Sequence, residues 1–254
     1  MPSAEEKGGG LAAALGGLGL VWRVVAVAAI IAGIVTFIVA VHGTGGAEPA
    51  ARGGPRHATI AAATTGRVDV FGHAGDHKPW TRMANPNRQG APLVFLVRQR
   101  RPGWLNVLLP TRPNGAHGWI KASDVKLATT DYRVDVSLSR HRLVVHKGTR
   151  TVVDRPAAVG AAKTPTPAGR FFVTVLLKPP DATGAYGPYA FGLSAHSAKL
   201  FHFGGGPGQV GVHGTNEPSS LGRPVSHGCV RVSNKTIRAL AKVLPLGTPV
   251  TITP

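Results

Sequence analysis

Hydrophobic and polar residues follow three different patterns along this chain of 254 residues. Residues 24–41 are an apolar run of eighteen residues without a charge, about the minimum length of a helix that spans a bilayer. Residues 42–66 are rich in Gly, Ala, Thr and Pro and have no hydrophobic period, which is typical of a flexible linker. From residue 67 onward, short apolar segments alternate with turn residues, which predicts strands.

The first β-rich unit is expected over residues 67–128. Its apolar runs at 94–97 and 104–109 have the length and composition of strands, and the Pro-Asn-Gly turn at 113–115 precedes another strand at 118–120. Through its block WLNVLLPTRPNGAHGWIKASDV, this unit resembles the small SH3-like β-barrels of bacterial envelope proteins.

The second β-rich unit is expected over residues 129–254. Apolar and polar residues alternate from Tyr132 to Ser139, which predicts a half-buried strand. Residues 184–197 are rich in glycine and aromatic residues, too irregular for a regular strand, and are expected to form a pocket wall. Near the C-terminus, Ser233 is a suitable N-cap for a short helix whose apolar face holds Ile237, Leu240, Ala241 and Leu244.

The net charge of the chain indicates which kinds of partner it is expected to bind. The net charge is +18 although only 16% of the residues are charged, and the excess is spread over both halves of the chain. A uniformly basic surface suits a polyanion, such as an anionic cell-wall polymer or an anionic lipid. The chain has no basic helix, zinc-finger spacing or aromatic stacking motif, so a nucleic-acid partner is not expected.

The candidate chemistry centres on Cys229, the one cysteine of the chain. A single cysteine cannot form an internal disulfide, and the scattered histidines lack the short spacing of a zinc site, so no metal or other cofactor is expected. The thiol is therefore either a buried side chain without a chemical role or a nucleophile. Positive charge on His227 or Arg231 would favour the thiolate, and His213 could approach the sulfur from a separate turn. These neighbours favour a nucleophile.

The same loop supplies the other groups that a cysteine nucleophile attacking a carbonyl requires. The backbone N–H groups of Gly228 and Cys229 are the expected oxyanion donors. Arg231 could bind a substrate carboxylate or brace the loop through a salt bridge. His227 could act on the thiolate or substrate, or could shape the loop. Loop-shaping roles are expected for three further residues (Gly214, Ser226 and Asn234), and either donor binding or plain packing for two tyrosines (Tyr186 and Tyr189).

Three separated motifs of the second unit resemble the L,D-transpeptidases of bacterial cell walls, the YkuD-type catalytic domain. They are TPTPAGRF at 164–171, VGVHGT at 210–215 and SHGCVRVSN at 226–234. The resemblance implies a mainly β fold, with a β-sandwich-like catalytic domain and a short C-terminal helix. This domain would follow the SH3-like barrel and an N-terminal transmembrane helix. The resemblance also implies that Cys229 is the nucleophile and that His213 is its base, oriented by the carbonyl of Gly214.

The activity implied is transfer between peptidoglycan peptide stems through a cysteine acyl-enzyme, which forms cross-links and is blocked covalently by carbapenems. Hydrolysis of the same acyl-enzyme, and wall binding without catalysis, stay as alternatives. Residues 1–23 would be a cytoplasmic tail and 24–41 a membrane anchor or, alternatively, a cleaved signal. The catalytic domain would then face the cell wall outside the cytoplasm.

Overall fold

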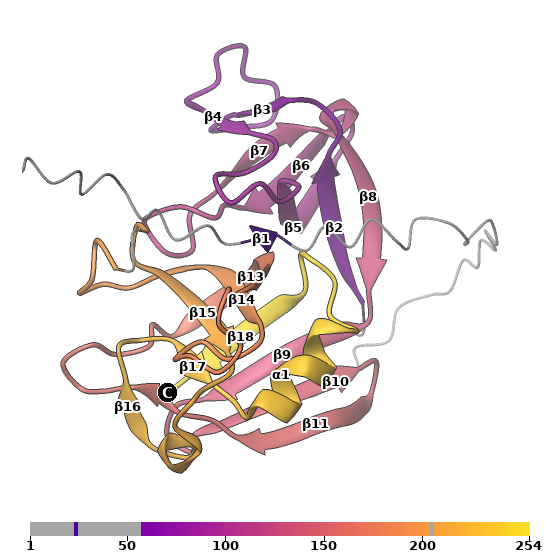
Figure 1. Ribbon diagram of the computed structural model, residues 1–254. Helices are drawn as coiled ribbons and strands as arrows, with labels where there is room; N and C mark the ends of the chain where they lie inside the picture. Colours follow the sequence, from indigo (N-terminus) through magenta and orange to yellow (C-terminus); the bar gives the residue numbers. More distant parts are fainter. Residues whose placement is uncertain (1–22, 25–56, 204–205) are drawn as a thin grey trace, which may run out of the picture.

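The computed structural model describes residues 23–24, 57–203 and 206–254, which form β-rich units and a short α-helix (Figure 1). No helix among these residues is long and apolar enough to cross a membrane. Val24, the first residue of the predicted span, lies in the two-residue strand β1 (Arg23–Val24), which pairs with β13. Residues 25–41 lie outside the described part of the chain, so the membrane helix stays a prediction.

The N-terminal unit contains a five-stranded sheet in the order β7-β6-β5-β2-β8 and a separate hairpin of β3 and β4. Large apolar side chains such as Phe95 and Ile120 fill its core. Its elements are β2 (Ala58–Ala63), β3 (Arg67–Val70), β4 (Thr81–Ala84), β5 (Val94–Arg101), β6 (Trp104–Leu108), β7 (His117–Lys121), the 3-10 turn η1 (Ala122–Asp124) and β8 (Val125–Thr130).

The prediction of a flexible linker over residues 42–66 is wrong for residues 58–63. Residues 58–63 form β2, which lies between β5 and β8 and pairs with both. The sequence ATIAAA has one large apolar residue, Ile60, so its strand character comes from pairing with its neighbours more than from its own composition. Residues 42–56 lie outside the described residues.

The C-terminal unit is built on a mixed sheet in the order β11-β10-β9-β18-β13-β14-β15-β17. Gly169–Phe172 of β13 pair with β18, whereas Val173–Leu177 pair with β14, so one long strand joins two half-sheets around a common core. The strands are β9 (Tyr132–Ser137), β10 (Arg142–Lys147), β11 (Arg150–Pro156), β13 (Gly169–Lys178), β14 (Ala190–His196), β15 (Gln209–His213), β17 (Val230–Arg231) and β18 (Pro249–Thr253).

Three smaller elements complete this unit: a parallel pair of β12 (Val159–Gly160) with β16 (Pro224–Ser226), the 3-10 turn η2 (Pro218–Ser220), and helix α1 (Asn234–Ala241). The helix begins as predicted, because Ser233 Oγ accepts a hydrogen bond from the N–H of Thr236 at 3.1 Å. Ile237 and Leu240 of its apolar face are buried in the core.

The expectation of irregular structure throughout residues 184–197 is wrong for its second half. Ala190–His196 form the regular strand β14, which is buried along its whole length between β13 and β15. A strand covered on both faces does not need alternating polar residues, which explains why periodicity did not reveal it. The predicted pocket wall is nevertheless found here, as described below.

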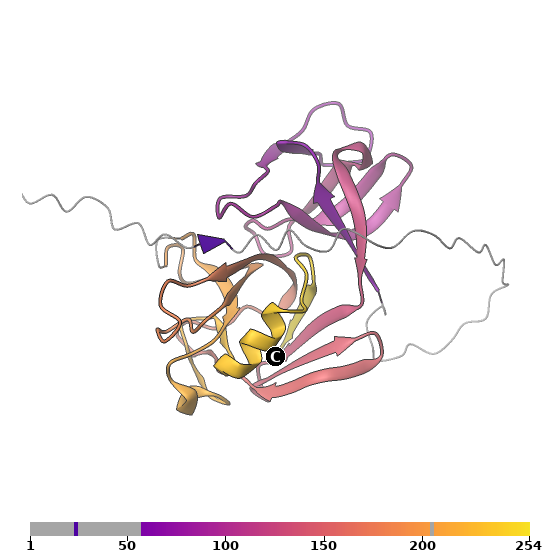
Figure 2. The same ribbon diagram turned by 45° about the vertical axis from the view of Figure 1, so that its right-hand side comes forward.

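The two units lie next to one another in Figures 1 and 2, and buried side chains join them. Phe172 of β13 is fully buried in a cluster with apolar residues of β2, β5 and β6. Gly247 approaches Ile60 so closely that an added Cβ would lie 2.5 Å from its side chain. Such a contact requires glycine at this position.

Candidate active site

The register between β15 and β17 brings the predicted nucleophile and base to one face of the sheet. These strands are parallel, with Val212 opposite Val230 and His213 opposite Arg231. Both valines are buried in the core. Because side chains alternate along a strand, the residues that flank the valines, Cys229 and His213, project from the other face. Strand pairing thus brings together two residues that lie sixteen positions apart in the sequence.

A backbone carbonyl orients His213. Its Nδ1 lies 2.6 Å from the carbonyl oxygen of Gly214, so Nδ1–H is the donor and Nε2 is left to accept a proton. Asn234 Oδ1 holds the adjacent turn by accepting from the N–H of Thr215 at 2.9 Å. A Cβ added to Gly214 would lie 2.2 Å from that oxygen. The loop-shaping roles predicted for Gly214 and Asn234 match this geometry.

Both reactive groups are in their neutral forms near pH 7. Burial lowers the pKa of His213 to about 4, against the opposing hydrogen bond to Gly214, and the charge of Arg231 lowers it further. Burial also raises the pKa of the Cys229 thiol, although the N–H of Gly211, 3.4 Å from the sulfur, and Arg231 act in the other direction. Arg231 thus favours the thiolate as predicted, but desolvation outweighs its charge and the thiol is neutral at rest.

Ser226 braces the loop that carries the thiol. Its hydroxyl donates to the carbonyl oxygen of Cys229 and accepts from the N–H of Gly228 at 3.1 Å. Gly228 has φ +114°, a conformation that favours glycine. Its N–H is thus used inside the loop of the free protein, and its role as an oxyanion donor stays a prediction. The N–H of Cys229 makes no hydrogen bond within the described part of the chain.

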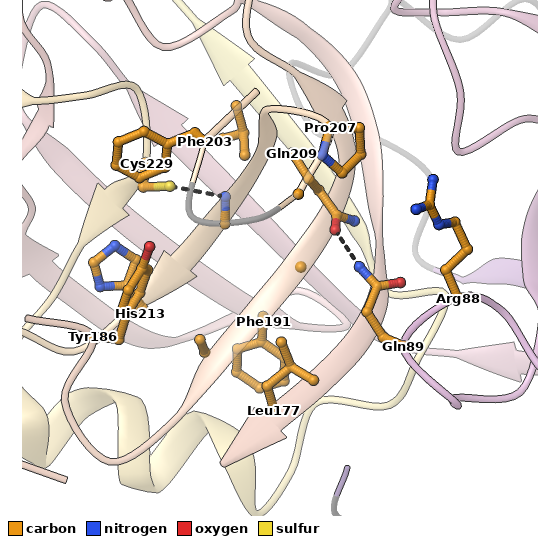
Figure 3. A pocket seen from close by; sticks show the side chains of 15 residues that line it. Arg88, Gln89, Leu177, Tyr186, Phe191, Phe203, Pro207, Gln209, His213 and Cys229 are labelled. Carbon is orange, nitrogen blue, oxygen red and sulfur yellow. Dashed lines mark hydrogen bonds between the residues drawn. The ribbon is translucent and has the colours of Figure 1, made fainter. Parts of the chain in front are cut away.

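The thiol and the imidazole open into a pocket of about 400 Å³ (Figure 3). Tyr186 lines the same end of it, and its ring centre lies 4.8 Å from that of His213. Burial raises the pKa of Tyr186, and the neighbouring Cys229 raises it further. Tyr189 does not line the pocket: it packs against the core, and its carbonyl accepts from the N–H of Gly214.

Arg231 and His227 have partners other than the thiol. Arg231 Nη1 lies 2.8 Å from Glu217 Oε2, which is the salt-bridge alternative considered for this residue. The exposed ring of His227 stacks on Phe203, with 5.6 Å between the ring centres. Neither residue lines the pocket, so the structure gives His227 no direct contact with the reacting groups. His227 instead supports Phe203, which does line the pocket.

Comparison with known proteins finds relatives of the C-terminal unit. The family model of the L,D-transpeptidase catalytic domain, YkuD, matches residues 131–252. YkuD of Bacillus licheniformis is 39% identical over 126 residues, which are 50% of this chain and 68% of that protein. The chain belongs to the L,D-transpeptidase family. YkuD of Bacillus subtilis is 36% identical over 124 residues, 49% of this chain and 67% of that protein.

Among solved structures, an L,D-transpeptidase from Mycobacterium smegmatis matches 63% of this chain and 90% of its own, with 15% identity and a TM-score of 0.41. In this chain, the residues that the structure describes contain no cluster of three or more His, Cys, Asp or Glu placed to hold a metal ion.

Several pocket residues of this L,D-transpeptidase were not predicted. Gly192 and Gly211 pair across β14 and β15 and line the pocket. A Cβ added to Gly192 would lie 2.7 Å from Val175, and one added to Gly211 would lie 2.8 Å from the Phe191 carbonyl oxygen. Gly211 lies within the VGVHGT motif, so the motif offered a signal for it. The sequence contains no signal for Arg88 and Gln89, because they belong to a loop of the other unit and reach the pocket only in the folded protein.

Proposed function

We propose that this chain forms cross-links between peptidoglycan peptide stems through an acyl-enzyme on Cys229. The observation that carries the proposal is the placement of Cys229 and His213 on one face of paired strands, in one pocket, with His213 Nδ1 held by the Gly214 carbonyl. Membership of the L,D-transpeptidase family makes the chain a transpeptidase; the cysteine mechanism and the stem substrate are the further steps proposed.

In the first half-reaction, Cys229 Sγ attacks the donor carbonyl while its proton moves to Nε2 of His213. The tetrahedral intermediate collapses to a thioester, and the terminal residue of the donor leaves as an amine with the proton from His213. In the second half-reaction, an acceptor amine attacks the thioester and gives a proton to His213, which returns it to the sulfur. One peptide bond breaks and one forms, so no external energy source is required.

Neutral resting forms suit this cycle. A buried thiol with a raised pKa and a buried imidazole with a pKa of about 4 do not form an ion pair before the substrate arrives. Proton transfer therefore accompanies attack, and the imidazolium exists only while the oxyanion is present to balance it. The N–H of Cys229 is the candidate donor to that oxyanion.

We also propose the setting expected from the sequence: an anchor at residues 24–41, a catalytic unit that faces the cell wall, and an SH3-like character for the N-terminal unit. The net charge of +18 supports contact with anionic wall polymers.

The decisive assay incubates the full chain with stem peptides and an added amine, and separates joined from trimmed products by mass spectrometry. Joined product that disappears in Cys229→Ala is expected. Trimmed product alone would favour the hydrolase alternative. A variant that still joins peptides would contradict the role of Cys229, and wall binding without any turnover would favour a non-catalytic protein.

A further inference from the structure

The pocket that holds Cys229 is completed by the N-terminal unit. Arg88 and Gln89, from the loop between β4 and β5, line it together with residues of β13, β14 and β15. In Figure 3, Cys229, His213 and Tyr186 lie at one side of the pocket, whereas Arg88 and Gln89 lie at the other. A substrate that extends from the thiol along this pocket meets the N-terminal unit.

The loop that carries Arg88 is fixed in place by hydrogen bonds. Asn87 Oδ1 accepts from the N–H groups of Gln89 and Ala91, both at 3.0 Å, which closes the turn around Arg88. Gln89 Nε2 then donates to Gln209 Oε1 at 2.7 Å, and so ties the turn to β15 of the other unit. The backbone of Arg88 is therefore held at the pocket before any ligand binds.

A second anchor lies nearby. Asn114 exchanges two hydrogen bonds with the backbone of His196, each of 2.8 Å. Arg112 donates to three carbonyl oxygens, those of Ser197, Leu200 and Pro207. These contacts hold the N-terminal unit against the segments that flank the pocket, so Arg88 keeps its position relative to Cys229.

Charge distinguishes Arg88 from the other residues of the pocket. Among the described lining residues it alone carries a permanent charge, and no Asp or Glu lines the pocket. Arg88 makes no ion pair within the described part of the chain, whereas Arg231 beside the thiol is already paired with Glu217. A guanidinium with no acidic partner, at the end of a pocket that holds no acid, is suited to bind a carboxylate through two hydrogen bonds.

We propose that Arg88 determines donor specificity by binding a carboxylate of the peptide that is remote from the bond attacked by Cys229. The inference rests on the proposed function in that the pocket is taken to hold a peptide donor. It adds that the N-terminal unit is part of the substrate site, and that the charge of the donor is read at a point separate from the reaction.

The test compares donor peptides in which each carboxylate in turn is replaced by a primary amide. We measure kcat/KM for the wild type, Arg88→Glu and Arg67→Glu. Arg67 is an exposed arginine of the same unit, outside the pocket, so its variant makes the same change in net charge. We also measure the Kd of each peptide for Cys229→Ala and for Cys229→Ala with Arg88→Glu, because binding is then read without turnover. Matching thermal unfolding of the two glutamate variants checks that they are folded.

One amidation is expected to lower kcat/KM about tenfold in the wild type and in Arg67→Glu. In Arg88→Glu the same amidation is expected to leave kcat/KM unchanged or to raise it, because the carboxylate would there face a like charge. The same pattern is expected in Kd. Equal donor preferences in the wild type and Arg88→Glu would overturn the proposal for Arg88. If both proteins still turned over the peptides, the proposed function would be unaffected by that result. An Arg88-dependent preference in Kd without turnover would support this inference and contradict the proposed function. Peptides that neither bind nor react would contradict both.

Discussion

At one end of the pocket, Cys229 and His213 are held by paired strands of the C-terminal unit. At the other end, Arg88 is exposed on a loop of the N-terminal unit. Burial keeps the first pair neutral, whereas exposure leaves the guanidinium of Arg88 open to an anion from solvent. The two proposals thus assign separate roles to the two ends of the pocket: Cys229 and His213 in the buried sheet carry out the reaction, and Arg88 on the exposed loop recognises the charge of the donor.

The largest expected effect is at the thiol end. His213→Gln removes the proton acceptor, so the rate of acyl transfer should fall about a thousandfold with every donor. The exposed His117→Gln is the matched control and should keep the wild-type rate. Rates with several donor peptides check the claim, and a loss confined to carboxylate-bearing donors would contradict the proposed separation of roles.

Stability should depend on pH through the same residue. The unfolded chain protonates His213 near pH 6.5 and the folded chain only near pH 4, so between these values the unfolded state binds more protons. The free energy of unfolding therefore falls as the pH is lowered, by about 3 kcal/mol between pH 7 and pH 4 from this group. Urea unfolding at several pH values should give a smaller fall for His213→Gln. Identical slopes would contradict the buried neutral imidazole.

Ser226 tests whether the thiol loop is rigidly held. Ser226→Ala leaves the N–H of Gly228 and the carbonyl of Cys229 without their partner, which should cost about 2 kcal/mol of the free energy of unfolding. Acyl transfer should slow about equally for all donors. The exposed Ser219→Ala should change stability by less than about 0.5 kcal/mol. Urea unfolding measures both, and equal effects of the two variants would contradict the bracing role.

The smallest effect is expected at the contact between the units. Asn114→Ala removes both hydrogen bonds to His196 and should cost about 1 kcal/mol of the free energy of unfolding. Asn114→Asp should cost at least as much, because its second carboxylate oxygen would face the carbonyl oxygen of His196 without a hydrogen to donate. Thermal and urea unfolding rank the variants. Wild-type stability in both variants would show that the exchange of hydrogen bonds is not what holds this contact.

The thiol end was largely predictable from the sequence because its residues lie in dense motifs. His213, Gly214, Ser226, Cys229 and Asn234 are all placed together as expected. Tyr189 is not, because the direction of a side chain depends on local folding that spacing does not show.

The arginine end and parts of the fold could not be predicted for a different reason. Arg88 reaches the pocket through packing between two units, and no local pattern encodes such a contact. The strands Ala58–Ala63 and Ala190–His196 escaped detection because the first is made mostly of small residues and the second is buried on both faces. In both strands, the tertiary surroundings outweigh the local hydrophobic pattern.

Covalent labelling of Cys229 tests the central claim most directly. The folded protein is incubated with a carbapenem, and the mass of the intact chain and of its peptides is measured. The account predicts a single adduct on Cys229, absent from Cys229→Ala and formed more slowly in His213→Gln. A folded wild type without an adduct, or an adduct that persists in Cys229→Ala, would contradict the assignment of Cys229 as the nucleophile.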